Sequence, residues 1–214
     1  MSLHEQLELQ KASFVARVPE EAQTAVFRHI FEQQQSGITF GLPAGSVAPD
    51  FSLTNPLGKT VRLHDELART HIALVFYRGS WCPYCNVQLR AYEQILPDIQ
   101  ALGGHLMAIS PQSPDNALTQ KEKEQLSFEV LSDPYGRTAD SYKLLFEMPN
   151  YLQRTFAEIF RLDLAAFNSA DRWTLPVPAT YLIDKRGIIR HASVNPDFME
   201  RMEPSALLDQ LRNL

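Results

Sequence analysis

The two cysteines of the chain lie three positions apart, in the segment Trp81-Cys82-Pro83-Tyr84-Cys85. An apolar run at 72–77 precedes them and is typical of a buried strand, and a helical pattern begins near Pro83. Two thiols at a strand-to-helix turn can close into a disulfide and open again. The residue types and their spacing therefore predict a redox-active dithiol, and with it an oxidoreductase.

The position of Pro83 predicts where each thiol lies on the helix. Proline suits the first helical position because its missing N–H would have no partner there. Cys82 is then expected at or near the N-cap and Cys85 in the first turn, where the positive end of the helix dipole favours a thiolate. Arg78, at the end of the preceding strand, could add to this effect.

The cysteine pair could also have one of three roles without redox activity. Free cysteines are often inert core residues. Half of a zinc site would need two more ligands, yet no two of the six histidines are three or four positions apart. A purely structural disulfide is uncommon in the cytoplasm. We prefer the redox-active interpretation and expect no bound metal. The chain also lacks a glycine-rich phosphate loop, so we expect no nucleotide or flavin cofactor.

Composition and charge limit the classes of partner. The 214 residues are 44% hydrophobic and 21% charged, which suffices for one sizeable core with additions. The net charge is -5 and no long basic run occurs, so nucleic acid and anionic membranes are poor candidates. No stretch approaches the roughly 20 apolar residues of a membrane span. The polar N-terminus lacks the apolar segment of a signal peptide, so we expect a cytoplasmic protein.

Strand and helix patterns alternate along the chain and predict an α/β fold, with a mixed β-sheet flanked by helices. Residues 1–44 are expected to form an N-terminal helical extension that ends in a linker, and 45–214 the main domain. Residues 147–176 fit no core element and are expected to form a helical insertion. Strands are expected at 51–53, 61–63, 72–77, 105–110, 128–131, 180–184 and 188–192, and helices at 83–101 with a kink at Pro97, at 114–125, after the turn at 133–136 to about 145, and at 204–211.

An apolar stripe at helical spacing marks the second half of the N-terminal extension. We prefer the interpretation that it packs against the main domain, and a contact in a homodimer is the alternative. The stripe consists of Ala22, Val26, Phe27, Ile30 and Phe31.

Residues 45–195 resemble the thioredoxin-fold group that contains the peroxiredoxins, of the alkyl hydroperoxide reductase and thiol-specific antioxidant (AhpC/TSA) kind. The order of several short segments carries the resemblance. The segments are Ala48-Pro49-Asp50-Phe51, Phe76-Tyr77, Ser110-Pro111, Leu131-Ser132-Asp133-Pro134, Ile183-Asp184 and Gly187-Ile188-Ile189-Arg190.

The segment that holds both cysteines, residues 78–85, is called the cysteine loop below. It departs from the pattern Pro-x-x-x-Thr-x-x-Cys of that family. Counting back from Cys85 puts Cys82 at the threonine and Arg78 at the proline. The same segment is similar to the Trp-Cys-x-x-Cys of thioredoxins, and Cys-Pro-Tyr-Cys is the glutaredoxin form. In that form Pro83 and Tyr84 would tune the redox potential. Trp81 is expected to pack beside the disulfide and shape docking, or to be plain core.

A second departure concerns the arginine that peroxiredoxins carry before the late strand, because Pro178 stands there. Thioredoxins have a cis-proline at this place, facing the disulfide. The resemblance therefore implies a cis-Pro178 and a substrate-binding turn that includes Thr180. An arginine of the insertion could replace the lost guanidinium, although a solvated face is the more common role; the candidates are Arg154, Arg161 and Arg172.

Three functions remain open from the sequence. The leading one is a peroxiredoxin-like peroxidase, in which one cysteine attacks a hydroperoxide, the other forms the disulfide, and a thioredoxin-type or glutaredoxin/glutathione-type donor reduces it. The second is a thiol–disulfide oxidoreductase that acts on protein or glutathione disulfides. The third is a non-enzymatic redox sensor. For the peroxidase, the alignment with peroxiredoxins makes Cys85 the cysteine that attacks the hydroperoxide, whereas the alignment with thioredoxins makes it Cys82. Cys82 is slightly favoured, because it is expected to be the better solvated thiol at the helix tip.

Overall fold

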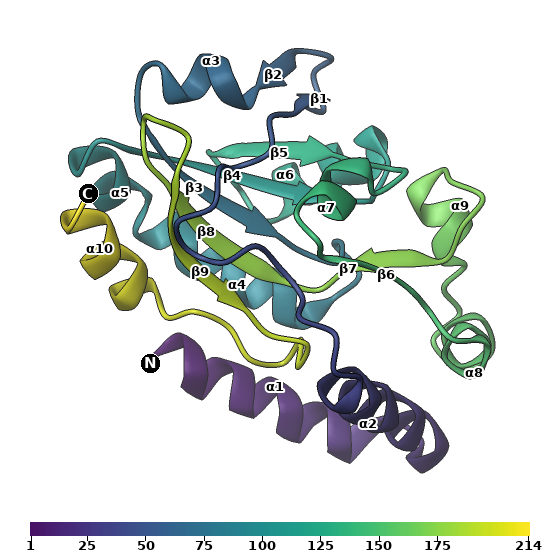
Figure 1. The fold of residues 1–214 in the computed structure, drawn as a ribbon. Coiled ribbons are helices and arrows are strands. Elements are labelled where there is room, and N and C mark those ends of the chain that lie inside the picture. Colours follow the sequence, from purple (N-terminus) through teal and green to yellow (C-terminus); the bar gives the residue numbers. More distant parts are fainter.

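The computed structural model describes residues 1–214, and a seven-stranded mixed β-sheet forms its centre (Figure 1). The strand order is β2-β1-β5-β4-β3-β8-β9, with β3, β4 and β5 parallel to one another and every other pairing antiparallel. This confirms the predicted mixed α/β fold. The strands are β1 Ser52–Thr54, β2 Thr60–Arg62, β3 His71–Phe76, β4 Gly104–Ser110, β5 Glu129–Ser132, β8 Ala179–Ile183 and β9 Ile189–Val194.

Strand β3 lies inside the sheet, as its apolar sequence predicts, because β4 pairs with one edge and β8 with the other. Successive side chains of a strand point to opposite faces. Ile72 and Leu74 accordingly join a core of 19 buried residues, whereas Ala73 and Val75 join a second core of 34. The sheet is therefore covered on both faces, and the end of β3 delivers the chain directly to the cysteine loop.

Helix α4 (Pro83–Gln94) carries the cysteines, with Cys82 at its N-cap and Pro83 in its first turn, as predicted. The helix expected at 83–101 is divided in two. It stops at Ile95, and α5 (Leu96–Ala101) follows with Pro97 in its first turn. A proline ring removes a backbone donor and clashes one turn back, so the helix cannot run straight through this point.

Four further helices cover the main domain. Helix α3 was not expected from the sequence, and α7 is shorter than the predicted helix. A left-handed residue stands on each side of α7, with φ +67° at Gly136 and φ +57° at Lys143, and confines it to little more than one turn. The bounds are α3 Leu63–Leu67, α6 Pro114–Lys123, α7 Arg137–Ser141 and α10 Pro204–Arg212.

The N-terminal region forms two helices, α1 (Leu3–Arg17) and α2 (Glu20–Gln35), which lie together along one side of the molecule (Figure 1). Helix α1 packs against α4, and the buried residues of both N-terminal helices join the core that contains the cysteines. Most of the predicted apolar stripe packs inward, whereas Phe31 is 62% exposed. None of the helices combines the length and the apolar character that a bilayer crossing needs.

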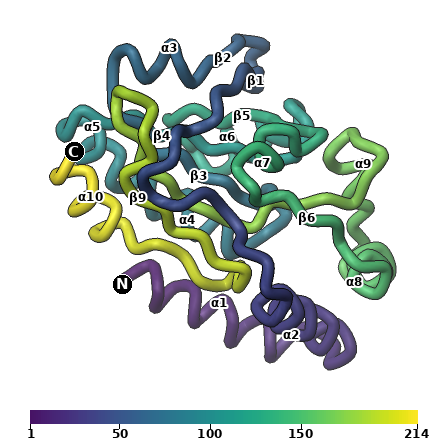
Figure 2. The backbone as a smooth tube through the Cα atoms, viewed as in Figure 1, coloured from purple at the N-terminus to yellow at the C-terminus, as the bar shows by residue number.

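The linker after α2 runs beside β9 before it reaches β1, as the dark blue segment of Figure 2 shows. The backbone N–H of Gly45 donates to the carbonyl of Ile189, and that of Ala48 to the carbonyl of Gly187, each at 2.8 Å. The linker is therefore tied to the main sheet. The proposed boundary between residues 44 and 45 stays a prediction.

The insertion is helical at its centre, as expected, but both of its ends are strands. Strands β6 (Leu145–Glu147) and β7 (Thr174–Pro176) form a separate antiparallel pair. Between them lie α8 (Asn150–Arg154), a π-helical turn η1 (Thr155–Ile159) and α9 (Leu164–Asn168). Helix α2 contacts both α8 and η1, so the N-terminal helices and the insertion meet over the same face.

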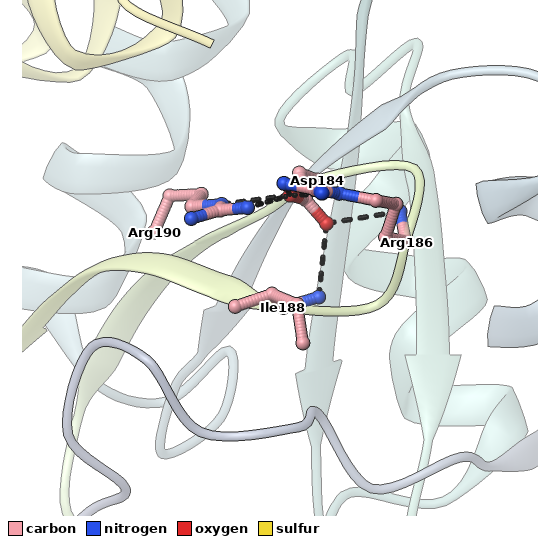
Figure 3. A network of polar contacts seen from close by, with 4 residues as sticks. All are labelled: Asp184, Arg186, Ile188 and Arg190. Atoms are coloured by element: carbon pink, nitrogen blue, oxygen red, sulfur yellow. Dashed lines mark hydrogen bonds and ion pairs between the residues drawn. The ribbon is translucent and has the colours of Figure 1, made fainter.

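The hairpin between β8 and β9 is held by Asp184, which Figure 3 shows at the centre of a polar network. Its carboxylate accepts hydrogen bonds from the backbone N–H groups of Arg186 at 2.9 Å and Ile188 at 3.0 Å. Arg190 adds an ion pair with an N–O distance of 2.6 Å. This network fixes the turn that returns the chain along β9 toward the cysteine helix.

The expected cis peptide bond before Pro178 is wrong, because the chain contains no cis peptide bond. Strand β7 leads into β8 after only two residues, and Val177 donates its N–H to the carbonyl of Leu144 at 2.8 Å. The two-residue connection between β7 and β8 therefore contains a trans proline.

Candidate active site

Both thiols are free and buried beneath the start of α4; Cys82 is 1% exposed and Cys85 is 0% exposed. The sequence slightly favoured Cys82 as the better solvated thiol; the structure covers both side chains almost completely, and of the two only Cys82 lines a cavity. Helix α1 packs along α4, and a loop after β9 carries Phe198 against Tyr84. Helix α1 from the N-terminal extension and the loop after β9 from the main domain thus both cover the start of α4.

The surroundings shift the pKa values of the two thiols in opposite directions. Burial raises the pKa of the Cys82 thiol, and its hydrogen bond to Cys85 raises it further. Burial also acts to raise the pKa of Cys85, but the hydrogen bond from Cys82 and the charge of Arg201 outweigh it and lower that pKa to about 5. The surroundings therefore favour the thiolate form at Cys85 over that at Cys82.

Arg201 is a charged residue beside Cys85 that the sequence did not single out. Its Nη2 lies 3.6 Å from the sulfur of Cys85, and its Nε donates to Oε1 of Gln88 at 2.9 Å. Its Nη1 donates to the carbonyl of Glu200 at 2.8 Å, so two hydrogen bonds hold the guanidinium group in place. The guanidinium comes from the loop after β9 and not from the insertion. The available signal was a pair of charged residues, Glu200 and Arg201, between two apolar ones, Met199 and Met202.

Arg78 lies below the cysteine loop and is only 4% exposed. Its guanidinium carbon is 3.8 Å from the ring centroid of Phe198 and 4.8 Å from that of Trp81. Burial lowers the pKa of Arg78, while the charges of Cys82 and Cys85 act in the opposite direction. The predicted positive contribution of Arg78 thus reaches the thiols from a site enclosed by aromatic rings.

Trp81 lines the same cavity as Cys82, and its ring lies edge-to-face against Phe156 of η1 at 5.3 Å. Gly79 makes room for this ring. It has φ +143°, and a Cβ built on it would lie 2.6 Å from the indole Nε1 of Trp81. Only glycine fits here, so the loop sequence positions Trp81 against the insertion.

Pro83 and Tyr84, between the cysteines, have different environments. Pro83 is exposed, whereas Tyr84 is 2% exposed and packs edge-to-face against Phe198 at 5.5 Å. The hydroxyl of Tyr84 is buried without a hydrogen-bond partner.

A buried ring of polar side chains holds the cysteine loop against α4. Gln112 accepts from the backbone N–H of Ser80 at 2.8 Å and donates to Oε1 of Gln120 at 2.8 Å. Gln120 donates to Asn86, and Asn86 donates back to the carbonyl of Ser80, each at 2.8 Å. The hydroxyl of Tyr77 joins the same glutamines. The ring closes on the loop, which fixes the N-terminus of α4.

Pro178 and Thr180 do not line the cavity at the cysteines. Pro178 is buried, and its carbonyl accepts from Asn195 at 3.4 Å. Thr180 accepts a hydrogen bond from Gln88 at 3.3 Å, and Gln88 in turn accepts from Arg201. Thr180 thus touches the site only through two other side chains.

A cavity of about 450 Å³ reaches Cys82 from the surface. Its walls come from α1, Val26 of α2, the cysteine loop with the first turn of α4, η1 with the residues that follow it, and the loop after β9. Cys85 is not among the lining residues and lies behind Cys82. Of the three insertion arginines considered from the sequence, Arg161 lines this cavity, whereas Arg172 forms an ion pair with Glu147.

Comparison with known proteins gives one family over most of the chain. Residues 44–192 match the model of the AhpC/TSA family. Peroxiredoxin Bcp of Escherichia coli strain K12 is 26% identical over 171 residues, which cover 80% of this chain and 96% of that protein.

Solved structures agree with this fold at lower identity. Peroxidoxin BcpB from Mycobacterium tuberculosis has a TM-score of 0.63 and 16% identity, over 81% of this chain and 98% of that one. A peroxiredoxin-like protein from Aquifex aeolicus also has a TM-score of 0.63, with 14% identity, over 82% of this chain and 90% of that one. The thioredoxin-like fold that the sequence predicts is thereby confirmed.

Proposed function

Since the chain belongs to the AhpC/TSA family, we propose that it reduces hydroperoxides, with Cys85 as the attacking thiolate and Cys82 as the resolving thiol. The family and its peroxiredoxin relatives support the peroxidase class. One observation carries the order of the thiols. The Cys85 sulfur, whose pKa is lowered to about 5, lies between the Cys82 thiol and the guanidinium of Arg201.

In the first step the Cys85 thiolate attacks the distal oxygen of the hydroperoxide. An S–O bond forms, the O–O bond breaks, and the alcohol or water leaves after it takes up a proton. Negative charge moves from sulfur to the departing oxygen during this step. Arg201 lies at the sulfur where its charge can stabilise that change.

In the second step the Cys82 thiol attacks the sulfenic acid on Cys85. An S–S bond forms, the S–O bond breaks, and water leaves with the proton of Cys82. The two residues occupy the N-cap and the first turn of one helix, and each thiol influences the pKa of the other. A thiol donor must then return two electrons, which fits the reducing cytoplasm predicted from the sequence.

Burial limits the hydroperoxide that can react. Cys85 is 0% exposed and lies behind Cys82, so a substrate must pass the cavity floor to reach it. Hydrogen peroxide and small alkyl hydroperoxides are therefore expected to react faster than a bulky aryl hydroperoxide.

The disulfide reductase alternative needs Cys82 as the nucleophile. In the reduced protein, burial and the adjacent Cys85 raise the pKa of that thiol, which keeps it protonated and poorly nucleophilic; the contribution of the Cys85 charge is absent once Cys85 is a sulfenic acid, as in the second step above. Because α1 packs over the cysteine helix, a folded protein substrate would also have to displace it. A redox sensor needs no fast turnover, so the rates of peroxide oxidation and disulfide reduction distinguish it from the two enzymes.

Stopped-flow oxidation by hydrogen peroxide tests the assignment. Cys85→Ser should lose the fast reaction, whereas Cys82→Ser should keep it and accumulate a sulfenic acid detectable by mass spectrometry. The serine hydroxyl of Cys82→Ser can still donate a hydrogen bond to Cys85, so this variant is a matched control for the thiolate.

The reverse pattern, with fast oxidation only in Cys85→Ser, would contradict the proposed order. Slow peroxide oxidation of the wild type together with rapid insulin reduction would favour the reductase. Neither reaction at an appreciable rate would favour the sensor.

A further inference from the structure

The cavity that reaches Cys82 is larger and more hydrophobic than the proposed reaction with peroxide requires. Ten of its 16 lining residues are hydrophobic, and its volume of about 450 Å³ lies in the range of small-molecule sites. The aromatic rings of Phe14, Trp81, Phe156 and Phe160 form much of the wall. A peroxide of two oxygen atoms needs no such volume, so the cavity is suited to a larger molecule with an apolar body.

The charge of the cavity has a single sign. Three arginines line it, Arg17, Arg78 and Arg161, and no aspartate or glutamate does. Arg17 and Arg161 are exposed and form no ion pair within the chain. They come from the end of α1 and from the residue after Phe160, so two separate segments bring them to one cavity. This arrangement complements an anionic group, and a carboxylate can accept two parallel hydrogen bonds from an arginine fork.

The buried walls also have unused hydrogen-bonding groups. Nε of Arg78, Nε1 of Trp81 and the hydroxyl of Tyr84 are buried without a partner in the chain. Arg78 and Tyr84 are 4% and 2% exposed. All three side chains line the cavity, and all three groups can donate a hydrogen bond. A ligand with acceptor atoms would supply what the chain itself does not.

The sulfur at the cavity floor identifies the chemistry of that ligand. Cys82 lines the cavity and Cys85 does not, so after oxidation the sulfur within reach is that of Cys82. In thiol–disulfide exchange the sulfur with the lower thiol pKa leaves faster. Cys85 is that sulfur, because hydrogen bonding and Arg201 outweigh its burial and lower its pKa to about 5. The site is therefore arranged for attack on Cys82 and departure of Cys85.

We propose that this cavity binds the electron donor, a small dithiol with an apolar chain that ends in a carboxylate, and presents its thiol to the Cys82 sulfur. The inference rests on the proposed Cys82–Cys85 disulfide. Arg17 and Arg161 hold the carboxylate at the rim, and the aromatic wall holds the chain. A protein donor is disfavoured because α1 and η1 enclose the approach and leave the Cys82 side chain 1% exposed.

The reduction balances without any further reactant. A donor thiolate attacks Cys82, a new S–S bond joins donor and enzyme, and the Cys82–Cys85 bond breaks with its electron pair on Cys85. The second donor thiol then attacks the donor sulfur of this mixed disulfide. The donor leaves as a cyclic disulfide, and Cys82 regains a proton. Two electrons pass from the donor to the enzyme.

The test compares dihydrolipoate with dihydrolipoamide, which share a dithiol and an apolar chain but differ in the carboxylate. The disulfide is first formed with the chemical oxidant diamide, so no peroxide reaction is needed. Reduction is followed by the fluorescence of Trp81 in a Trp173→Phe background and checked by titration of free thiols. We expect dihydrolipoate to react roughly fivefold faster than dihydrolipoamide, because paired exposed charges contribute modestly. Salt should diminish this ratio.

Variants locate the effect. Arg17→Gln with Arg161→Gln should bring the carboxylate-to-amide rate ratio close to one. Arg154→Gln is the matched control, since Arg154 is an exposed arginine of the same insertion that does not line the cavity. The amide rate within each variant serves as the internal reference for an intact site.

Equal rates with the two dithiols in the wild type would overturn the inference. A ratio that persists in the double variant, or that falls equally in Arg154→Gln, would also overturn it. Reduction by thioredoxin that is much faster than by dihydrolipoate would assign the donor to a protein instead. Slow oxidation by peroxide would contradict the proposed function but leave the reduction experiment unaffected, so the two failures are distinguishable.

Discussion

Nη2 of Arg201 lies 3.6 Å from the sulfur of Cys85, although 116 positions separate the two residues in the sequence. The contact joins the loop after β9 to the first turn of α4 and places a charge at the proposed nucleophile. This chain has Pro178 at the position where peroxiredoxins carry an arginine. A guanidinium is nevertheless present, and it arrives from a different segment of the chain.

The rate of oxidation by hydrogen peroxide should follow the ionisation of Cys85. Burial opposes ionisation, but the Cys82 hydrogen bond and Arg201 lower the pKa of Cys85 to about 5. The rate should therefore be half-maximal near that pH, rise above it and be almost constant at neutral pH. Stopped-flow fluorescence between about pH 4 and about pH 8 measures the profile. A rate that still rises steeply above neutral pH would show an ordinary thiol.

Arg201→Gln should slow oxidation by hydrogen peroxide at neutral pH by roughly a hundredfold, as expected on loss of one aligned donor. It should also move the half-maximal pH upward, because the charge that lowers the pKa of Cys85 is gone. Arg201→Lys should restore part of both effects. The pH shift separates an electrostatic role from simple damage to the fold.

Arg90→Gln is the control for this variant. Arg90 lies on the same helix as Cys85, is exposed and pairs with Glu124. If Arg90→Gln changes the half-maximal pH as much as Arg201→Gln does, the effect arises from net charge and not from the contact at Cys85.

Local chemistry made the start of α4 predictable. The residues that set the N-cap and the first turn, Cys82 and Pro83, are adjacent to the helix that they begin, and the structure places them as expected. The apolar run of β3 predicted an internal strand for the same reason, because burial on both faces requires that composition.

Long-range packing was not predictable. The burial of Cys82 depends on α1, which precedes it by more than sixty positions, and the approach of Arg201 depends on the course of the chain after β9. The family resemblance misled at Pro178, because the two-residue connection from β7 into β8 contains no cis bond. Neither α1 nor Arg201 lies inside the matched residues 44–192.

Gln112→Ala should destabilise the protein by about 1–3 kcal/mol, since it leaves buried partners unsatisfied. Gln112 is 0% exposed and binds both Ser80 and Gln120. The loop that positions the N-terminus of α4 should loosen, so oxidation by hydrogen peroxide should slow as well. Urea unfolding and stopped-flow kinetics measure the two effects.

Gln100→Ala offers a comparison, because Gln100 is exposed on α5 and outside the polar ring. It should change neither stability nor oxidation appreciably. A Gln112 variant that is as stable and as fast as the wild type would mean that the ring does not hold the loop.

Asp184→Asn should destabilise the protein by about 1–3 kcal/mol at neutral pH, because charged hydrogen bonds to Arg190 and to two backbone N–H groups are lost. Burial acts to raise the pKa of Asp184, but the hydrogen bonds from Ile188 and Arg190 outweigh it and lower that pKa below 3.8. A lowered carboxyl pKa gives stability that is present above the pKa of the unfolded chain and is lost as the pH falls through the folded value. The difference in unfolding free energy between wild type and variant should therefore be constant at neutral pH and shrink below about pH 4. Urea unfolding at a series of pH values measures it, and a difference that grows on acidification would contradict the role of the ionised carboxylate in the β8–β9 turn.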